Sequence, residues 1–147
     1  MWKEFIAIQR GGLVRSIGVS NVSPTQLDEL TRASGVTPTV DQIEWSPRLY
    51  DPDMAVALRA RGVVLEGYSP FKTSRLNDPV LVEIAPRHGV TPAQIVLRWH
   101  VDHGFVVIPK SANPDRIAAN CDVFGFALDP AEVARIDALG SGRGGRR

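Results

Sequence analysis

A lysine, a hydroxyl and an arginine follow one short apolar segment late in the sequence. Residues 105–108 are apolar, which predicts a buried strand, and a proline directly after them ends it. Lys110 and Ser111 come next, and a helix predicted from about residue 115 to 120 brings Arg116 back beside them. Cations and a hydroxyl between a strand end and a helix N-terminus suit a phosphate group. Because a planar guanidinium can stack on adenine or clamp a 2′-phosphate, this pattern predicts a site for a phosphorylated nucleotide.

Strand-like and helix-like segments alternate along the chain and must position these groups. Strands are predicted over residues 14–19, 39–45, 63–67 and 105–108, and helices over about 2–9, 24–33, 52–61, 79–88, 91–102, 114–120 and 130–139. Such alternation predicts a parallel sheet with right-handed crossovers, and strands that are apolar on both faces predict a sheet covered on both sides. Local pattern fits either a small open sheet or half of an eight-stranded barrel.

Composition and charge are those of an ordinary globular protein. With 147 residues, 44% of them hydrophobic, one domain is expected, and a net charge of +1 excludes a strongly basic nucleic-acid binder. No apolar run approaches the roughly 20 residues that cross a bilayer, and no signal-peptide pattern opens the chain. Cys121 is the only cysteine, so we expect no disulfide framework, a reducing and cytoplasmic location, and a small buried thiol.

The other polar candidates have ordinary structural explanations. Four aspartates adjoin prolines at helix starts and are interpreted as caps rather than catalytic carboxylates: Asp51, Asp53, Asp78 and Asp129. The three histidines lie near helix ends, where a positive charge suits the helix dipole: His88, His100 and His103. Tyr50 is interpreted as a packing residue, and no residues have the spacing of metal ligands.

Motifs at the ends of the four predicted strands resolve the choice of fold. They are Gly18-Val19-Ser20-Asn21, Asp41-Gln42-Ile43-Glu44, Tyr68-Ser69-Pro70-Phe71, and Ile108-Pro109-Lys110-Ser111 followed by Arg116 and Asn120. In this order and at these spacings they resemble the aldo-keto reductases, NADPH-dependent enzymes on a (β/α)8 TIM barrel. The resemblance implies that residues 1–139 are the C-terminal half of such an α/β domain, a half-barrel of four βα units with a C-terminal helix. Residues 140–147 would be a disordered Gly/Arg tail. Phosphate sites after strands 7 and 8 of TIM barrels agree with this placement.

The resemblance also implies which residues hold the cofactor, NADP(H). The nicotinamide end would be held by Ser20, Asn21, Gln42 and Tyr68, the pyrophosphate by Ser69 and Phe71, and the adenosine 2′-phosphate and adenine by Lys110, Ser111, Arg116 and Asn120. Two positions depart from the family pattern. Ala119 replaces a frequent acid before the adenine-contacting asparagine, and Asp41 replaces a frequent asparagine beside Gln42.

The residues that perform the family's chemistry are not visible in this sequence. A tyrosine acid, a lysine, an aspartate and a histidine come from the first half of the family's barrel, on strands that would precede residue 1. The chain alone is therefore expected to be inactive, and a small carbonyl substrate is expected only if the barrel is completed. No nucleic-acid or membrane partner is expected.

Three explanations remain open. The chain can be the cofactor-holding half of a reductase that reduces aldehydes or ketones, a non-catalytic NADP(H)-binding half-barrel, or one half of a split barrel completed by a partner chain. Half of a barrel exposes two sheet edges, flanking residues 14–19 and 105–108, so self-association or a covering partner is also expected.

Overall fold

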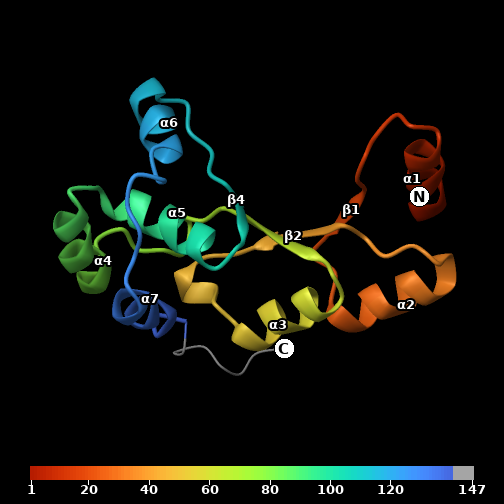
Figure 1. The fold of residues 1–147 in the computed structure, drawn as a ribbon, viewed down its shortest axis with the longest axis horizontal. Coiled ribbons are helices and arrows are strands. Elements are labelled where there is room, and N and C mark those ends of the chain that lie inside the picture. Colours follow the sequence, from red (N-terminus) through yellow and green to blue (C-terminus); the bar gives the residue numbers. More distant parts are fainter. Residues whose placement is uncertain (141–147) are drawn as a thin grey trace. The chain divides into compact units, whose positions relative to one another are not determined.

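Four short strands form one parallel sheet in the order β1-β2-β3-β4 (Figure 1). The computed structural model describes residues 1–140, so the predicted tail, residues 140–147, lies outside the described residues except for Gly140, which is buried. The strands are β1 (Gly18–Ser20), β2 (Val40–Glu44), β3 (Val64–Tyr68) and β4 (Val106–Ile108). Their sequential order confirms the predicted α/β half-barrel, because a doubly wound sheet would reverse its order at a switch point.

The helices begin where the sequence predicts them. They are α1 (Trp2–Arg10), α2 (Pro24–Ser34), α3 (Pro52–Ala60), α4 (Pro79–Ile84), α5 (Pro92–Asp102), α6 (Pro114–Cys121) and α7 (Pro130–Asp137), with 3₁₀ turns η1 (Pro47–Leu49) and η2 (Ala85–His88). Ser23, Thr91 and Asp129 each form a capping box before a proline. The predicted helix 79–88 changes to the turn η2 because Pro86 lacks the N–H that would continue it. Among residues 1–140, no helix has the length and apolar character needed to span a membrane.

The two outer strands are shorter than predicted. β1 begins at Gly18 rather than at Val14, and β4 begins at Val106 rather than at Phe105. An outer strand has a hydrogen-bonded neighbour on one side only, so its ends leave the ladder easily.

Strands β3 and β4 are covered on one face only, as expected for half of a barrel that lacks the rest of its interior. Leu65 is buried while Val64 is 38% exposed, and in β4 both Val106 and Ile108 are 42% exposed. Side chains alternate between the two faces of a strand, so one face of these strands faces solvent. In a closed barrel that face would line the packed interior.

The chain divides into two compact units, and the first comprises Met1–Ile43 and Pro52–Glu66. Its buried side chains include Ile17, Leu27 and Leu58, and α2 packs against α3. Arg61 makes a two-pronged bond to Asp28 with both N–O distances 2.7 Å, which ties the end of α3 to α2. Trp2 Nε1 donates to Ser34 Oγ at 3.2 Å and holds α1 to α2.

A buried carboxylate anchors the turn after β1. Asp41 is 0% exposed, and its Oδ1 accepts a hydrogen bond from Val22 N at 3.4 Å. Its Oδ2 has no hydrogen-bond partner among the described residues. Burial raises the pKa of Asp41 above its ordinary value. Asn21, just before the bonded amide, has a left-handed φ of 56°, a conformation that an L-residue keeps only when its surroundings hold it.

The second unit comprises Glu44–Asp51 and the described residues from Gly67 onward. An aromatic cluster joins η1 to α5: Tyr50 makes edge contacts with Trp45 at 6.1 Å and Trp99 at 5.3 Å between ring centroids, and Phe105 contacts both tryptophans. Trp99 Nε1 donates to Asp137 Oδ1 at 2.7 Å, which ties α7 to the same cluster. Tyr50 is therefore a packing residue, as the sequence predicts.

His100 is fully buried beside this cluster. Its Nδ1 lies 2.7 Å from the carbonyl oxygen of Val96, and burial lowers the pKa of His100 to about 4. The neutral ring is therefore the form that the folded protein accommodates at neutral pH.

We predict that protonation of His100 destabilises the fold in mild acid. Because the pKa of His100 is lowered in the folded state, the contribution of its neutral ring to stability is present above about pH 6.5 and is lost as the pH falls toward 4. The loss should be on the order of 3 kcal/mol in the free energy of unfolding. Urea denaturation of the wild-type chain and of His100→Asn between pH 7 and 4 checks this, and an equally steep pH dependence in both would contradict it.

We also predict that Asp41→Asn stabilises the chain at pH 7. Because the pKa of Asp41 is raised in the folded state, the wild-type carboxyl contributes most below about pH 4 and costs stability as it ionises above that. The gain should be on the order of 1 kcal/mol, the usual cost of a buried polar group without a partner, and should disappear at low pH.

Asp28→Asn is the matched control for that variant. The Arg61 guanidinium lowers the pKa of Asp28, so the charged carboxylate favours the folded state. Asp28→Asn should therefore destabilise the chain at pH 7, whereas Asp41→Asn should stabilise it. Chemical denaturation at pH 7 and pH 4 compares the three proteins. A loss of stability in Asp41→Asn at pH 7 would show that the buried charge is well compensated.

Candidate functional site

The predicted nicotinamide-binding residues of the first unit lie together at the end of β1. Parallel pairing of β1 with β2 sets Ser20 opposite Gln42. Ser20 Oγ and Asn21 N both donate to the carbonyl oxygen of Gln42, at 2.8 and 3.1 Å, and Asn21 Nδ2 donates to Ser20 Oγ at 2.9 Å. The structure thus joins Ser20, Asn21 and Gln42, which are far apart in the sequence, into one group of hydroxyl and amide side chains. Such a group can hydrogen-bond a carboxamide.

Glu66 adds a carboxylate to this group that the sequence reasoning missed. Gln42 Nε2 donates to Glu66 Oε1 at 2.5 Å, and both side chains are half-buried. A signal for it was present, because a charged residue interrupts the apolar run of β3 two positions before Tyr68. Alternation along the strand places residues 66 and 68 on the same face.

In the second unit, Tyr68, Ser69 and Phe71 lie at the end of β3 and in the turn that follows. The Tyr68 carbonyl accepts from Trp45 N at 3.3 Å, and the Ser69 carbonyl accepts from Lys72 N at 3.1 Å. Ser69 has a left-handed φ of 54°, so the chain reverses sharply at this position. All three predicted residues are half-buried rather than part of the core.

The segment after this turn is tied to the segment after β2 by polar contacts. Lys72 Nζ lies 3.1 Å from Glu44 Oε1, and Ser46 Oγ lies 2.6 Å from Thr73 Oγ1. Arg48 pairs with Asp78 at 2.5 Å, and Asp78 also caps α4 by accepting from Val80 N. These contacts hold the loop that begins at Ser69.

Lys110, Ser111 and Arg116 lie around the start of α6. Asn113 is the cap of this helix: its Oδ1 accepts from Arg116 N at 3.0 Å, and its own N–H donates to Ser111 Oγ at 3.2 Å. Asn113 therefore links the Ser111 side chain to the backbone of Arg116. Lys110 and Arg116 are exposed, and within the described part of the chain neither pairs with an acidic side chain. Two exposed cations that make no ion pair with the described residues, beside a helix N-terminus whose first turn also carries Asp115, can bind a phosphate.

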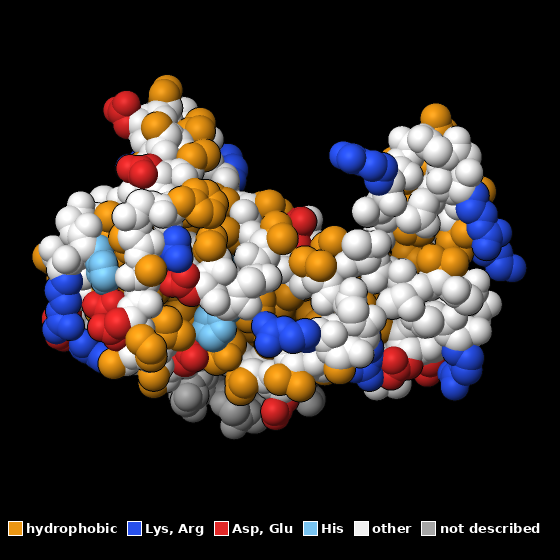
Figure 2. Space-filling view, viewed as in Figure 1, with side chains coloured by type: hydrophobic (Ala, Val, Ile, Leu, Met, Phe, Trp, Pro, Cys, Tyr) orange, Lys and Arg blue, Asp and Glu red, His pale blue; other side chains and the backbone are white. Residues whose placement is uncertain are grey.

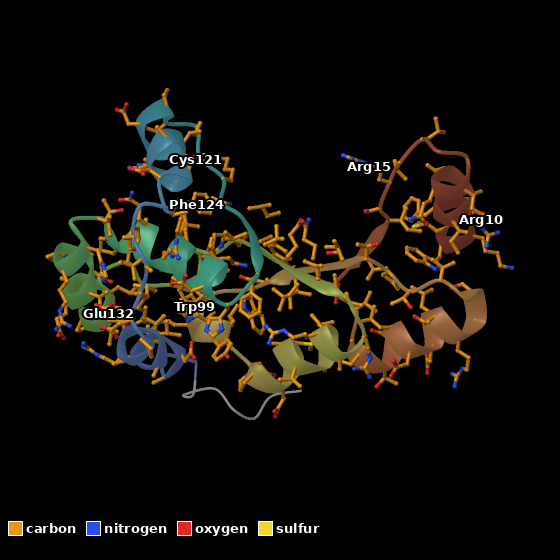
Figure 3. All side chains as sticks on the ribbon, in the orientation of Figure 1. Arg10, Arg15, Trp99, Cys121, Phe124 and Glu132 are labelled. Atoms are coloured by element: carbon orange, nitrogen blue, oxygen red, sulfur yellow. The ribbon has the colours of Figure 1, made fainter. Side chains whose placement is uncertain are left out.

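Asn120 lies further along α6, at the edge of an apolar cavity of about 450 Å³. The cavity is lined mainly by apolar side chains of α5, β4 and α6, together with Phe124. Figure 2 shows the hydrophobic surface over α6, and Figure 3 shows Cys121 and Phe124 at its base. The expectation that Cys121 is buried is wrong, because α6 has no buried residue and leaves its thiol exposed. The apolar lining of this cavity suits apolar groups rather than a phosphate.

The predicted site residues are thus divided between the two units. The first unit holds Ser20, Asn21 and Gln42, and the second holds Tyr68, Ser69, Phe71, Lys110, Ser111, Arg116 and Asn120. Among residues 1–140, no group of His, Cys, Asp and Glu could hold a metal ion.

Comparison with known proteins places these motifs in a family. The sequence model of the aldo/keto reductase family matches residues 1–141. The chain is 47% identical to 2,5-diketo-D-gluconic acid reductase B of a Corynebacterium species and 43% identical to an aldo-keto reductase of Mycolicibacterium smegmatis. Each match covers 97% of this chain and 52% of the relative, so the chain spans about half the length of the curated relatives it matches.

A solved structure has the same fold. A crystal structure of a mutant of the protein Gox0644 in complex with NADPH superposes with a TM-score of 0.91 at 39% identity, covering 99% of this chain and 55% of that one. With the family match, the strand order and the strand-end motifs in agreement, the chain belongs to the aldo/keto reductase family.

Proposed function

We propose that this chain is the NADP(H)-binding half of an aldo-keto reductase barrel that reduces aldehydes or ketones when complete. The observation that carries the proposal is the pair of exposed cations, Lys110 and Arg116, at the cap of α6, together with the hydroxyl and amide group of the first unit. The relative solved with NADPH supports NADP(H) as the ligand, and the reductases among the relatives support carbonyl reduction.

The residues present fit the chemistry of this cofactor. Lys110, Ser111 and Arg116 offer two positive charges and a hydroxyl, which suit the dianionic 2′-phosphate that distinguishes NADP(H) from NAD(H). When bound, NADPH supplies a hydride from its nicotinamide ring. Ser20, Asn21 and Gln42 would bind the carboxamide and so determine which ring face is presented, and the ring of Tyr68 would stack against the nicotinamide.

The proton for the carbonyl oxygen must come from a group outside this set. Tyr50 is occupied in the aromatic cluster with Trp45 and Trp99, and Tyr68 is assigned to stacking. We therefore assign the general acid and the groups that tune it to polypeptide that completes the barrel, in the same chain or in a partner. This is the reason to expect binding without turnover from these 147 residues.

We predict that the chain binds NADPH and that Arg116→Ala weakens this binding about 10- to 100-fold, because a charge-assisted contact to phosphate is lost. The same substitution should lower the affinity for NADH, which lacks the 2′-phosphate, by less than about twofold. Fluorescence titration of each cofactor checks this, with Arg15→Ala, another exposed arginine, as the matched control. Absence of saturable NADPH quenching up to millimolar concentration would refute the proposal.

We further predict that the chain alone does not consume NADPH with 4-nitrobenzaldehyde. A fusion to the part of the Corynebacterium reductase that precedes its matched segment should restore turnover, and Tyr68→Ala in the fusion should reduce it. Absorbance at the NADPH maximum follows both reactions. Steady turnover by the isolated chain that is lost in Lys110→Ala would show instead that its own residues form a complete active site.

A further inference from the structure

Glu66 lies on the same strand face as the residues assigned to the nicotinamide. In β3, Leu65 and Gly67 are buried, so Glu66 lies on the opposite face with Val64 and Tyr68. In β2, Asp41 is buried and Gln42 lies on the opposite face. The contact from Gln42 Nε2 to Glu66 Oε1, at 2.5 Å, crosses between the two strands within the first unit.

This contact determines which end of the Gln42 amide is available. A primary amide has one acceptor oxygen and one donor NH₂ group, whereas a carboxylate only accepts. The NH₂ group must therefore face Glu66, and Oε1 must point away from it. A bond to an ionised acceptor is roughly twice as strong as one between neutral groups, so the opposite orientation is disfavoured.

The backbone of Gln42 is held as firmly as its side chain. Its carbonyl oxygen accepts from Ser20 Oγ at 2.8 Å and from Asn21 N at 3.1 Å. The preceding residue, Asp41, is buried. The amide therefore extends from a fixed point, and its remaining freedom is the exchange of its O and N ends, which Glu66 removes.

We propose that Glu66 is a positioning residue that turns the Gln42 amide so that its Oε1 accepts an N–H of the cofactor's carboxamide. This inference rests on the proposed function. Without Glu66, Gln42 can present either end, so the site loses its preference for a ligand group that donates a hydrogen bond over one that only accepts.

Three ligands test this in the intact chain by isothermal titration calorimetry. NADP⁺ carries the carboxamide, its 3-acetylpyridine analogue replaces that amide with a ketone that cannot donate, and 2′,5′-ADP lacks the nicotinamide altogether. The wild-type chain should bind NADP⁺ about tenfold more tightly than the analogue, since one hydrogen bond is lost. Glu66→Val should reduce this ratio to about one or two, and Glu66→Gln, whose amide can either accept from Gln42 or donate to it, should restore at most part of it.

The controls separate the possible failures. Val64→Ala, on the same face of β3, should keep the wild-type ratio. The affinity of every variant for 2′,5′-ADP should lie within about twofold of the wild-type value. An unchanged ratio in Glu66→Val with normal 2′,5′-ADP binding overturns the role of Glu66 and leaves the proposed function intact. A wild-type chain that binds neither NADP⁺ nor 2′,5′-ADP overturns the proposed function itself.

Glu66→Thr guards against loss of folding in the valine variant. Threonine suits a strand but is too short to reach the Gln42 amide, so it should also lower the ratio. If both variants lose 2′,5′-ADP binding, Glu66 is needed for the fold and the positioning role is refuted. If Glu66→Gln keeps the full wild-type ratio, the acceptor-only character of Glu66 is not what orients the Gln42 amide, and the proposal also fails.

Discussion

The parallel register of β1 against β2 is the constraint on which the candidate site depends. It sets Ser20 opposite Gln42 and so allows one carbonyl to accept from both Ser20 and Asn21. The register needs a glycine at its start, because a Cβ on Gly18 would lie 2.7 Å from the carbonyl oxygen of Val40. The turn that follows is held by Asp41 through the amide of Val22. A slip of one residue would turn each side chain of β1 to the other face and separate the hydroxyl and amide groups.

The polar side chains of Asp41 and Glu66 lie where they bear on the geometry of the candidate site. Asp41 keeps an oxygen without a partner among the described residues, and its burial disfavours the charged form. Glu66, which is half-buried, accepts from the Gln42 amide that we propose it orients. His100, in contrast, is accommodated as a neutral ring within the core of the second unit. Functional sites commonly retain such unfavourable groups, because a chemically specific arrangement requires polar atoms at fixed positions.

The residues proposed to bind phosphate follow a different principle. Lys110 and Arg116 are exposed on a short connection and at the first turn of α6, a helix with no buried residue. Their position depends on the cap formed by Asn113 and its bond to Ser111. A site that relies on charge tolerates this surface location, since an anion brings most of the binding free energy and hydrogen bonds complete it.

Local sequence signals were sufficient for the order and type of the elements and for the family. The helices that begin with a capping residue followed by proline, at Ser23, Thr91 and Asp129, depend on neighbouring residues only, so their starts could be predicted correctly. The strand-end motifs identified the family because the residue types there are dictated by ligand chemistry. Tertiary structure alone decided the pairing of Gln42 with Glu66, the exposure of Cys121 and the full burial of His100. Register and burial arise from contacts between segments distant in the chain, and no local pattern of residues specifies those contacts.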